Sequence, residues 1–149
     1  AAPIPKTREL MCRDGLKYYA RIPAKNIRAA ADEIEKQRKI LASAKPATRR
    51  GEILQIELDF PSSMAAESCH IMLWQQALAA GKNAEARRLA GRGIAALAEI
   101  DREFKAYWPT RNKGDTSKCS AFLQWRIWDY KEAALHFPPE AARPPRQKP

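Results

Sequence analysis

Apolar residues recur along the chain with the spacing of helix faces, and prolines separate the periodic segments. Between Pro23 and Pro46 one narrow apolar stripe predicts a helix that covers a core with a single face. The members of this stripe are Ile27, Ala30, Ile34 and Leu41. Because proline lacks a backbone N–H and clashes with the preceding turn, the two prolines bound this helix.

Residues 50–80 predict the central helix, because they carry two apolar stripes instead of one. The first stripe consists of Ile53, Ile56, Phe60, Met64, Ile71, Trp74 and Leu78, and the second of Leu54, Leu58, Ala65, Cys69 and Met72. A helix with two apolar stripes is expected to contact neighbours on two sides. Pro61 lies inside this segment and predicts either a kink or a break.

A further helix is predicted over residues 84–108, with Gly81 ending the central helix and Asn83 as the N-cap. The connection is so short that the two helices are expected to be antiparallel neighbours. The broad apolar face consists of Leu89, Ile94, Leu97, Ile100, Phe104 and Tyr107. Gly91 and Gly93 lie within this segment, where glycine costs about 1 kcal/mol relative to alanine. We therefore expect them to let a neighbouring helix approach closely.

The last predicted helix follows Pro109 and a polar loop, begins at a Thr116 or Ser117 cap and reaches about Leu135. Its core stripe is Cys119, Phe122 or Leu123, Arg126 or Ile127, Tyr130 and Ala134. Trp125 and Trp128 lie off this stripe. They are therefore candidates for a surface position.

The composition agrees with an all-α fold. Valine is absent, and Ile and Thr together supply fifteen residues against twenty-seven alanines, whereas strands favour β-branched residues and helices favour alanine. We predict an antiparallel helical bundle of about four helices with extended proline-rich termini. Residues 1–22 form an N-terminal extension with a short helix or extended segment, residues 23–136 the bundle domain, and residues 137–149 a proline-rich basic tail.

The charge of the chain indicates acidic partners. The net charge is +10, and the basic residues gather toward the two ends: residues 1–50 hold thirteen Lys and Arg against five Asp and Glu, residues 51–100 four against six, and residues 101–149 ten against six. Basic ends suit an acidic protein surface, RNA or acidic lipid headgroups. The alternative is a charged surface that serves only to keep the protein in solution. No apolar run approaches the length of a membrane span, so no transmembrane segment is expected in this chain.

The sequence offers little catalytic chemistry, and we predict no catalytic, metal or cofactor-binding residue. Three widely spaced cysteines, at positions 12, 69 and 119, contain no CxxC pair and are expected to be mostly buried thiols. The two histidines form no zinc motif. Glu57 and Glu67 flank the apolar part of the central helix, where burial would suit a proton-handling pair. Exposure or pairing with an arginine is the interpretation that we favour.

Aromatic and basic residues cluster near the C-terminus, and Trp and Arg are enriched at the energetic centres of protein interfaces. We predict interface roles for Trp125, Trp128, Arg111, Phe137, Arg143 and Arg146. At least one of the two tryptophans is expected to contact another chain. The proline-rich tails are expected to bind extended across a partner surface, because proline has little conformational freedom to lose.

The proline-punctuated basic bundle broadly resembles accessory subunits of organellar complexes. From the proline-rich tails, the start at Ala1 and the lack of a recognisable active-site motif, we expect a non-catalytic accessory subunit of a large multi-protein assembly. An organellar energy-transducing complex, of the respiratory, ATP synthase or photosynthetic kind, is the assembly that we favour. A protein component of an organellar ribosome, binding RNA through its basic ends, is the first alternative. A small helical ligand-binding or enzymatic domain is the second. The start at Ala1 without methionine suits a processed N-terminus and favours the mitochondrion, with a plastid or the cytoplasm as other locations.

Overall fold

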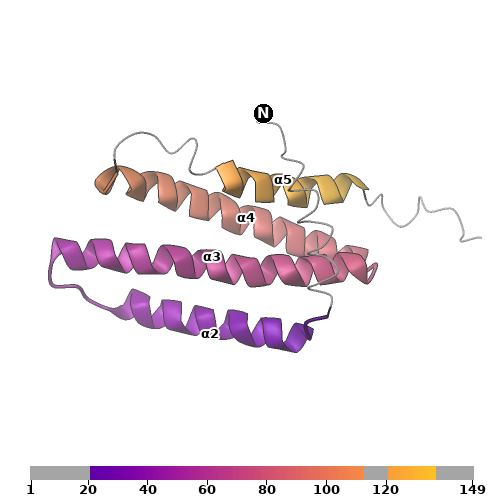
Figure 1. The fold of residues 1–149 in the computed structure, drawn as a ribbon, viewed down its shortest axis with the longest axis horizontal. Coiled ribbons are helices and arrows are strands. Elements are labelled where there is room, and N and C mark those ends of the chain that lie inside the picture. Colours follow the sequence, from indigo (N-terminus) through magenta and orange to yellow (C-terminus); the bar gives the residue numbers. More distant parts are fainter. Residues whose placement is uncertain (1–20, 113–120, 137–149) are drawn as a thin grey trace, which may run out of the picture. The chain divides into compact units, whose positions relative to one another are not determined.

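The computed structural model describes residues 21–112 and 121–136, which are helical apart from short connections. The helices are α2 (Ala24–Ser43), α3 (Arg49–Ala79), α4 (Asn83–Tyr107), the short 3-10 helix η1 (Trp108–Thr110) and α5 (Ala121–His136) (Figure 1). The all-α prediction is confirmed. The predicted N-terminal extension up to residue 20, the capping residues Thr116 and Ser117, and the C-terminal tail lie outside the described residues.

The described helices belong to two compact units that meet in sequence between Lys82 and Asn83. In the first unit α2 packs on α3, and in the second α4 packs on η1 and α5. Within each unit the partner helices are antiparallel, since contacts that move forward along one helix move backward along the other.

Polar side chains join α2 to α3. Arg38 donates two hydrogen bonds to the carboxylate of Asp59, from Nε to Oδ1 over 2.9 Å and from Nη2 to Oδ2 over 3.0 Å. At either end of the unit a glutamine of α3 reaches a backbone carbonyl: Gln55 donates to Leu41 over 2.6 Å and Gln76 to Ile22 over 2.7 Å. These bonds fix which side of α3 faces α2.

The face of α2 agrees with the sequence prediction except at one position. Ile27 is buried, and Ile34 and Leu41 are half-buried, but Ala30 is exposed and Ala31 is half-buried in its place. The reason is the rotation of α2: Arg38 must face α3 to reach Asp59, and Ala31 lies on the same side as position 38, seven residues away.

Helix α3 continues through Pro61 without a break. A proline in a helix leaves the carbonyl four residues earlier without its usual donor. Nearby hydroxyl groups add donors to this stretch, because Ser62 Oγ donates to the Leu58 carbonyl over 2.8 Å and Ser63 Oγ to the Phe60 carbonyl over 2.7 Å. Of the two alternatives that the sequence left open, a break is therefore wrong.

Both ends of α3 have recognisable capping structures. At the start, the side chain of Thr48 accepts a hydrogen bond from the Gly51 amide over 3.1 Å. At the end, the Lys82 amide donates to the Ala77 carbonyl and the Gly81 amide to the Leu78 carbonyl, which is the Schellman pattern. Gly81 has a φ of +67°, a conformation that glycine adopts without strain. Its predicted role as the helix stop is confirmed.

The second unit has its core between α4 and α5. Its most deeply buried side chains are Leu97, Leu123 and Tyr130, and Ile127 is buried as well. Leu123 and Ile127 therefore fill the two core positions of α5 for which the sequence left alternatives. Gly93 lies directly against the ring of Tyr130, so the predicted close approach of a helix at a glycine is confirmed there. Gly91 is exposed, and among the described residues of its unit no atom lies within 4 Å of a Cβ placed on it.

A buried carboxylate also joins the two helices. Asp101 Oδ2 accepts hydrogen bonds from Lys105 Nζ over 2.5 Å and from Gln124 Nε2 on α5 over 3.2 Å. Close by, the ring of Phe104 on α4 packs against the ring of Trp108 in η1, with the two centroids 5.1 Å apart. These contacts hold η1 and the start of α5 against the C-terminal half of α4.

Candidate protein-binding surface

The N-terminal half of α3 exposes large apolar side chains that the sequence assigned to a core. Leu54 is 53% exposed, Leu58 is 49% exposed and Ile56 is 46% exposed. Ala65, a further member of the second predicted stripe, is exposed as well. The expectation that both stripes of this helix are covered is therefore wrong for its N-terminal half.

The polar contacts with α2 explain this exposure. Gln55 and Asp59 point toward α2, and a helix turns by about 100° per residue, so the side of Leu54 and Leu58 is rotated away from α2 by about a quarter of a turn. Ile56, two residues from Leu54, lies on nearly the opposite side. Two separate apolar surfaces thus flank the contact with α2, one around Leu54 and Leu58 and the other around Ile56. Among the described residues nothing covers the surface around Leu54 and Leu58.

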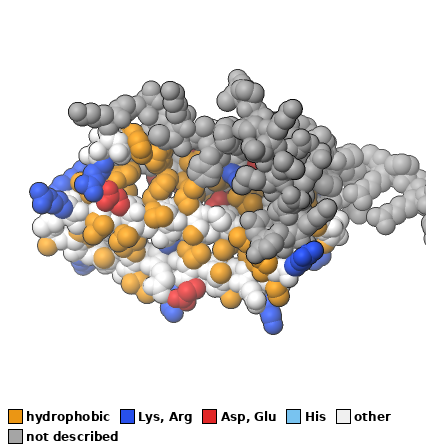
Figure 2. Space-filling view, viewed as in Figure 1, with side chains coloured by type: hydrophobic (Ala, Val, Ile, Leu, Met, Phe, Trp, Pro, Cys, Tyr) orange, Lys and Arg blue, Asp and Glu red, His pale blue; other side chains and the backbone are white. Residues whose placement is uncertain are grey.

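The exposed side of Leu54 and Leu58 forms a continuous uncharged stripe, which we call the α3 stripe. It consists of Leu54, Leu58, Pro61, Ala65, Ser68 and Met72, of which Met72 is half-buried and the others are exposed. Figure 2 shows hydrophobic side chains over the α2–α3 unit, with charged ones mainly near its edges. Contiguous apolar surface of this kind marks interaction sites in proteins.

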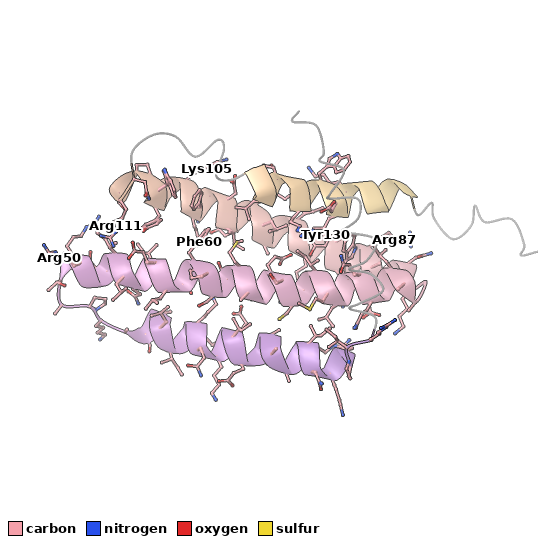
Figure 3. All side chains as sticks on the ribbon, viewed as in Figure 1. Arg50, Phe60, Arg87, Lys105, Arg111 and Tyr130 are labelled. Carbon is pink, nitrogen blue, oxygen red and sulfur yellow. The ribbon has the colours of Figure 1, made fainter. Side chains whose placement is uncertain are left out.

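The charges around the α3 stripe are unevenly distributed. No Lys or Arg occurs between Gly51 and Gly81, although the chain has twenty-seven. Basic residues instead gather around the start of α3, where Lys45 lies in the connection before the helix and Arg49 and Arg50 in its first turn. All three are exposed, and we call them the basic turn. Arg49 pairs with Glu52 over 3.1 Å, and Figure 3 shows Arg50 at the end of α3 where the stripe begins.

The structure describes only part of the interface predicted from the sequence. Trp128 on α5 is 39% exposed, as its position off the core stripe predicts, and Arg111 is exposed after η1. The side chain of Trp125 and the residues Phe137, Arg143 and Arg146 lie outside the described residues. The predicted contacts of Trp128 and Arg111 with another chain stay predictions.

The two candidate carboxylates of α3 do not form a pair. Glu57 is half-buried and Glu67 is buried, but ten residues of helix separate them by about 15 Å. Glu67 lies instead on one face with Ser63 and His70, all three of them buried. The Ser63 hydroxyl donates to the Phe60 carbonyl within the helix. A shared proton between Glu57 and Glu67 is therefore excluded.

Cys69, the cysteine that the structure describes, is buried with a free thiol. Burial raises the pKa of this thiol above its ordinary value, because the thiolate would lose its hydration. The group therefore stays protonated at neutral pH, in agreement with the expectation of a buried structural thiol. Cys12 and Cys119 lie outside the described residues.

Two further points concern residues 21–112 and 121–136, the part of the chain that the structure describes. No three His, Cys, Asp or Glu side chains of this part come together as metal ligands. None of its helices combines the length and the apolar character of a membrane span.

Comparisons with known proteins add no family. No protein-family model matches the chain, and searches of curated proteins and of solved structures find no match.

Sequence reasoning missed the α3 stripe because it took every periodic apolar position for core. A signal was nevertheless present in the alternating spacing of four and three residues from Leu54 to Met72, combined with small or polar residues at Ser68 and Ala65. Serine is mostly exposed in folded proteins, so its place in the stripe argues against complete burial.

Proposed function

We propose that this chain is a non-catalytic accessory subunit of a large multi-protein assembly. The observation that carries the proposal is the α3 stripe, with Leu54 and Leu58 each about half exposed and uncovered by the described residues. Fully burying one leucine is worth about 1.5–3 kcal/mol. Because Leu54 and Leu58 are each already about half-buried, a partner that covers both gains roughly that amount. A surface of this kind suits a subunit that is held in place by its neighbours.

The use of polar side chains in the α2–α3 unit supports a scaffolding role. Arg38 and Asp59 form an ion pair between the helices, which raises the pKa of the Arg38 guanidinium above its ordinary value through the hydrogen bond with Asp59. Gln55 and Gln76 fix the two ends of the same contact. These groups hold the two helices in register and thereby present the α3 stripe as a rigid surface.

The setting that we propose is an organellar energy-transducing complex in the mitochondrion, of the respiratory or ATP synthase kind. Support for this part comes from the sequence: a net charge of +10 suits docking on acidic protein surfaces or acidic headgroups. Subcellular fractionation tests the location directly. Recovery of the endogenous protein in the cytosolic fraction would contradict the organellar part and leave the subunit proposal standing.

A ribonucleoprotein component is the second candidate, and one observation favours it. Arg87, Arg88 and Arg92 are exposed near the start of α4, and clustered arginines suit phosphate contacts. Binding of this kind weakens steeply with salt. If the endogenous assembly loses this chain between low and moderate salt, and ribonuclease also releases it, the chain is a component of a ribonucleoprotein.

Site-specific photo-crosslinking in cells tests the proposal. A benzophenone amino acid is placed at position 58 on the α3 stripe, and for comparison at position 32, which is exposed on α2. We expect cross-linked protein products from position 58 and few from position 32, because only the former lies on the apolar surface. Equal products from both positions, or products with RNA alone, would rule the subunit proposal out.

A further inference from the structure

The spacing of the α3 stripe is that of a helix–helix seam. Its members recur at alternating intervals of four and three residues, from Leu54 through Leu58, Pro61, Ala65 and Ser68 to Met72. A repeat of 3.5 residues on average keeps one face of a helix against a second helix along its whole length. In addition, the small side chains in the middle leave room for large ones from a partner.

The stripe itself contains no charge, and the basic turn lies at one end of it. Lys45 and Arg50 are exposed there, while the far end, from Met72 to Gly81, has no charged residue at all. A partner that covers the stripe meets Lys45 and Arg50 at that end, and exposed Lys82 follows Gly81 beyond the other end. Carboxylates of the partner over the basic turn complement its charge.

A second copy of this chain fits the stripe poorly. In a parallel arrangement the basic turns of the two copies lie side by side, and their like charges repel. In an antiparallel arrangement each basic turn faces the stretch from Met72 to Gly81 of the other copy, which has no carboxylate. Charge complementarity thus favours a different protein over self-association.

We propose that the α3 stripe is the docking site for an amphipathic helix of a partner protein, with carboxylates that lie over the basic turn. The inference rests on the proposed function, since it names the kind of partner that a subunit meets there.

The test uses the full chain and two labelled synthetic helices of about three heptads, with leucine at the a and d positions. One peptide ends in glutamates and the other in lysines, and binding is followed by fluorescence anisotropy. We expect the glutamate peptide to bind more tightly, although lysines at a C-terminus favour the helix itself. Equal or tighter binding of the lysine peptide would refute the role of the basic turn.

Two single substitutions on α3 provide a matched comparison. Leu58→Asp places a charge in the stripe, whereas Ile56→Asp places one at a similarly exposed apolar position on the other side. We expect Leu58→Asp to weaken peptide binding at least about tenfold, because the variant loses the burial of the exposed half of a leucine and also has to desolvate a carboxylate. We expect Ile56→Asp to leave binding nearly unchanged. Circular dichroism verifies that both variants fold, and Leu58→Ala serves as the milder variant.

Other outcomes would overturn the inference. Equal weakening by Leu58→Asp and Ile56→Asp, or no weakening by either, would show that the stripe is not the site. Sedimentation of the free chain as a dimer that Leu58→Asp abolishes would identify a second copy as the occupant. If neither peptide binds while position 58 still cross-links to a protein in cells, the helix partner is wrong and the subunit proposal survives.

Discussion

Replacing Gly93 with alanine is expected to lower the free energy of unfolding of the α4–α5 unit by about 2 kcal/mol. A Cβ at this position would lie 2.6 Å from the hydroxyl oxygen of Tyr130 and 2.5 Å from a ring carbon. Tyr130 is fully buried, so its ring can move away only by displacing its closely packed neighbours. The gain in helix propensity, about 1 kcal/mol for glycine to alanine, does not offset the overlap.

Gly91→Ala is the matched control for this prediction. Gly91 lies on the same helix but is exposed, with no atom within 4 Å of the added Cβ. The same substitution there should raise the free energy of unfolding by roughly 0.5–1 kcal/mol. Urea denaturation of the two variants measures both effects. A change of the same sign at the two positions would mean that Gly93 does not set the distance between α4 and α5.

Replacing Pro61 with alanine should stabilise the α2–α3 unit by about 2 kcal/mol, since proline inside a helix costs about 3 kcal/mol relative to alanine. The position is exposed, so the smaller side chain leaves no buried cavity. Alanine also restores an amide donor to the carbonyl of Glu57, four residues earlier. Thermal unfolding followed by circular dichroism should show a higher midpoint for the variant.

The variant Pro61→Gly distinguishes two contributions to the stability of α3: the hydrogen bond that proline lacks, and the conformational freedom of the backbone at this position. Glycine restores the same donor but costs about 1 kcal/mol relative to alanine, so its stability should fall between that of the wild type and that of Pro61→Ala. If Pro61→Ala instead destabilises the unit, a bend at this proline is needed for α3 to follow α2.

The sequence was enough to predict where the helices begin and end, because the residues that determine these ends act on the backbone locally. Pro23 starts α2, Gly81 adopts the positive φ that ends α3, and prolines and glycines act through their own backbone. The core of α4 and α5 followed from the spacing of Leu97, Leu123 and Tyr130, although two positions of α5 had alternatives. Periodicity identifies a face but does not distinguish neighbouring positions on it.

The sequence did not reveal which apolar surface of α3 is covered, because that depends on contacts between distant residues. The hydrogen bonds of Arg38 with Asp59 and of Gln55 with Leu41 determine the rotation of α3. The rotation in turn leaves Leu54 and Leu58 in solvent. Trp128 was easier to anticipate, because its place beside the core stripe follows from helical spacing alone.

Incorporation of the chain into its assembly in cells tests the central claim most directly. Tagged wild type, Leu58→Asp and Ile56→Asp are expressed at equal levels, and the fraction of each in the large assembly is measured on native gels. We predict that Leu58→Asp falls at least about tenfold below the wild type, while Ile56→Asp enters normally. Equal incorporation of all three would contradict the assignment of the α3 stripe as the surface that holds this subunit in place.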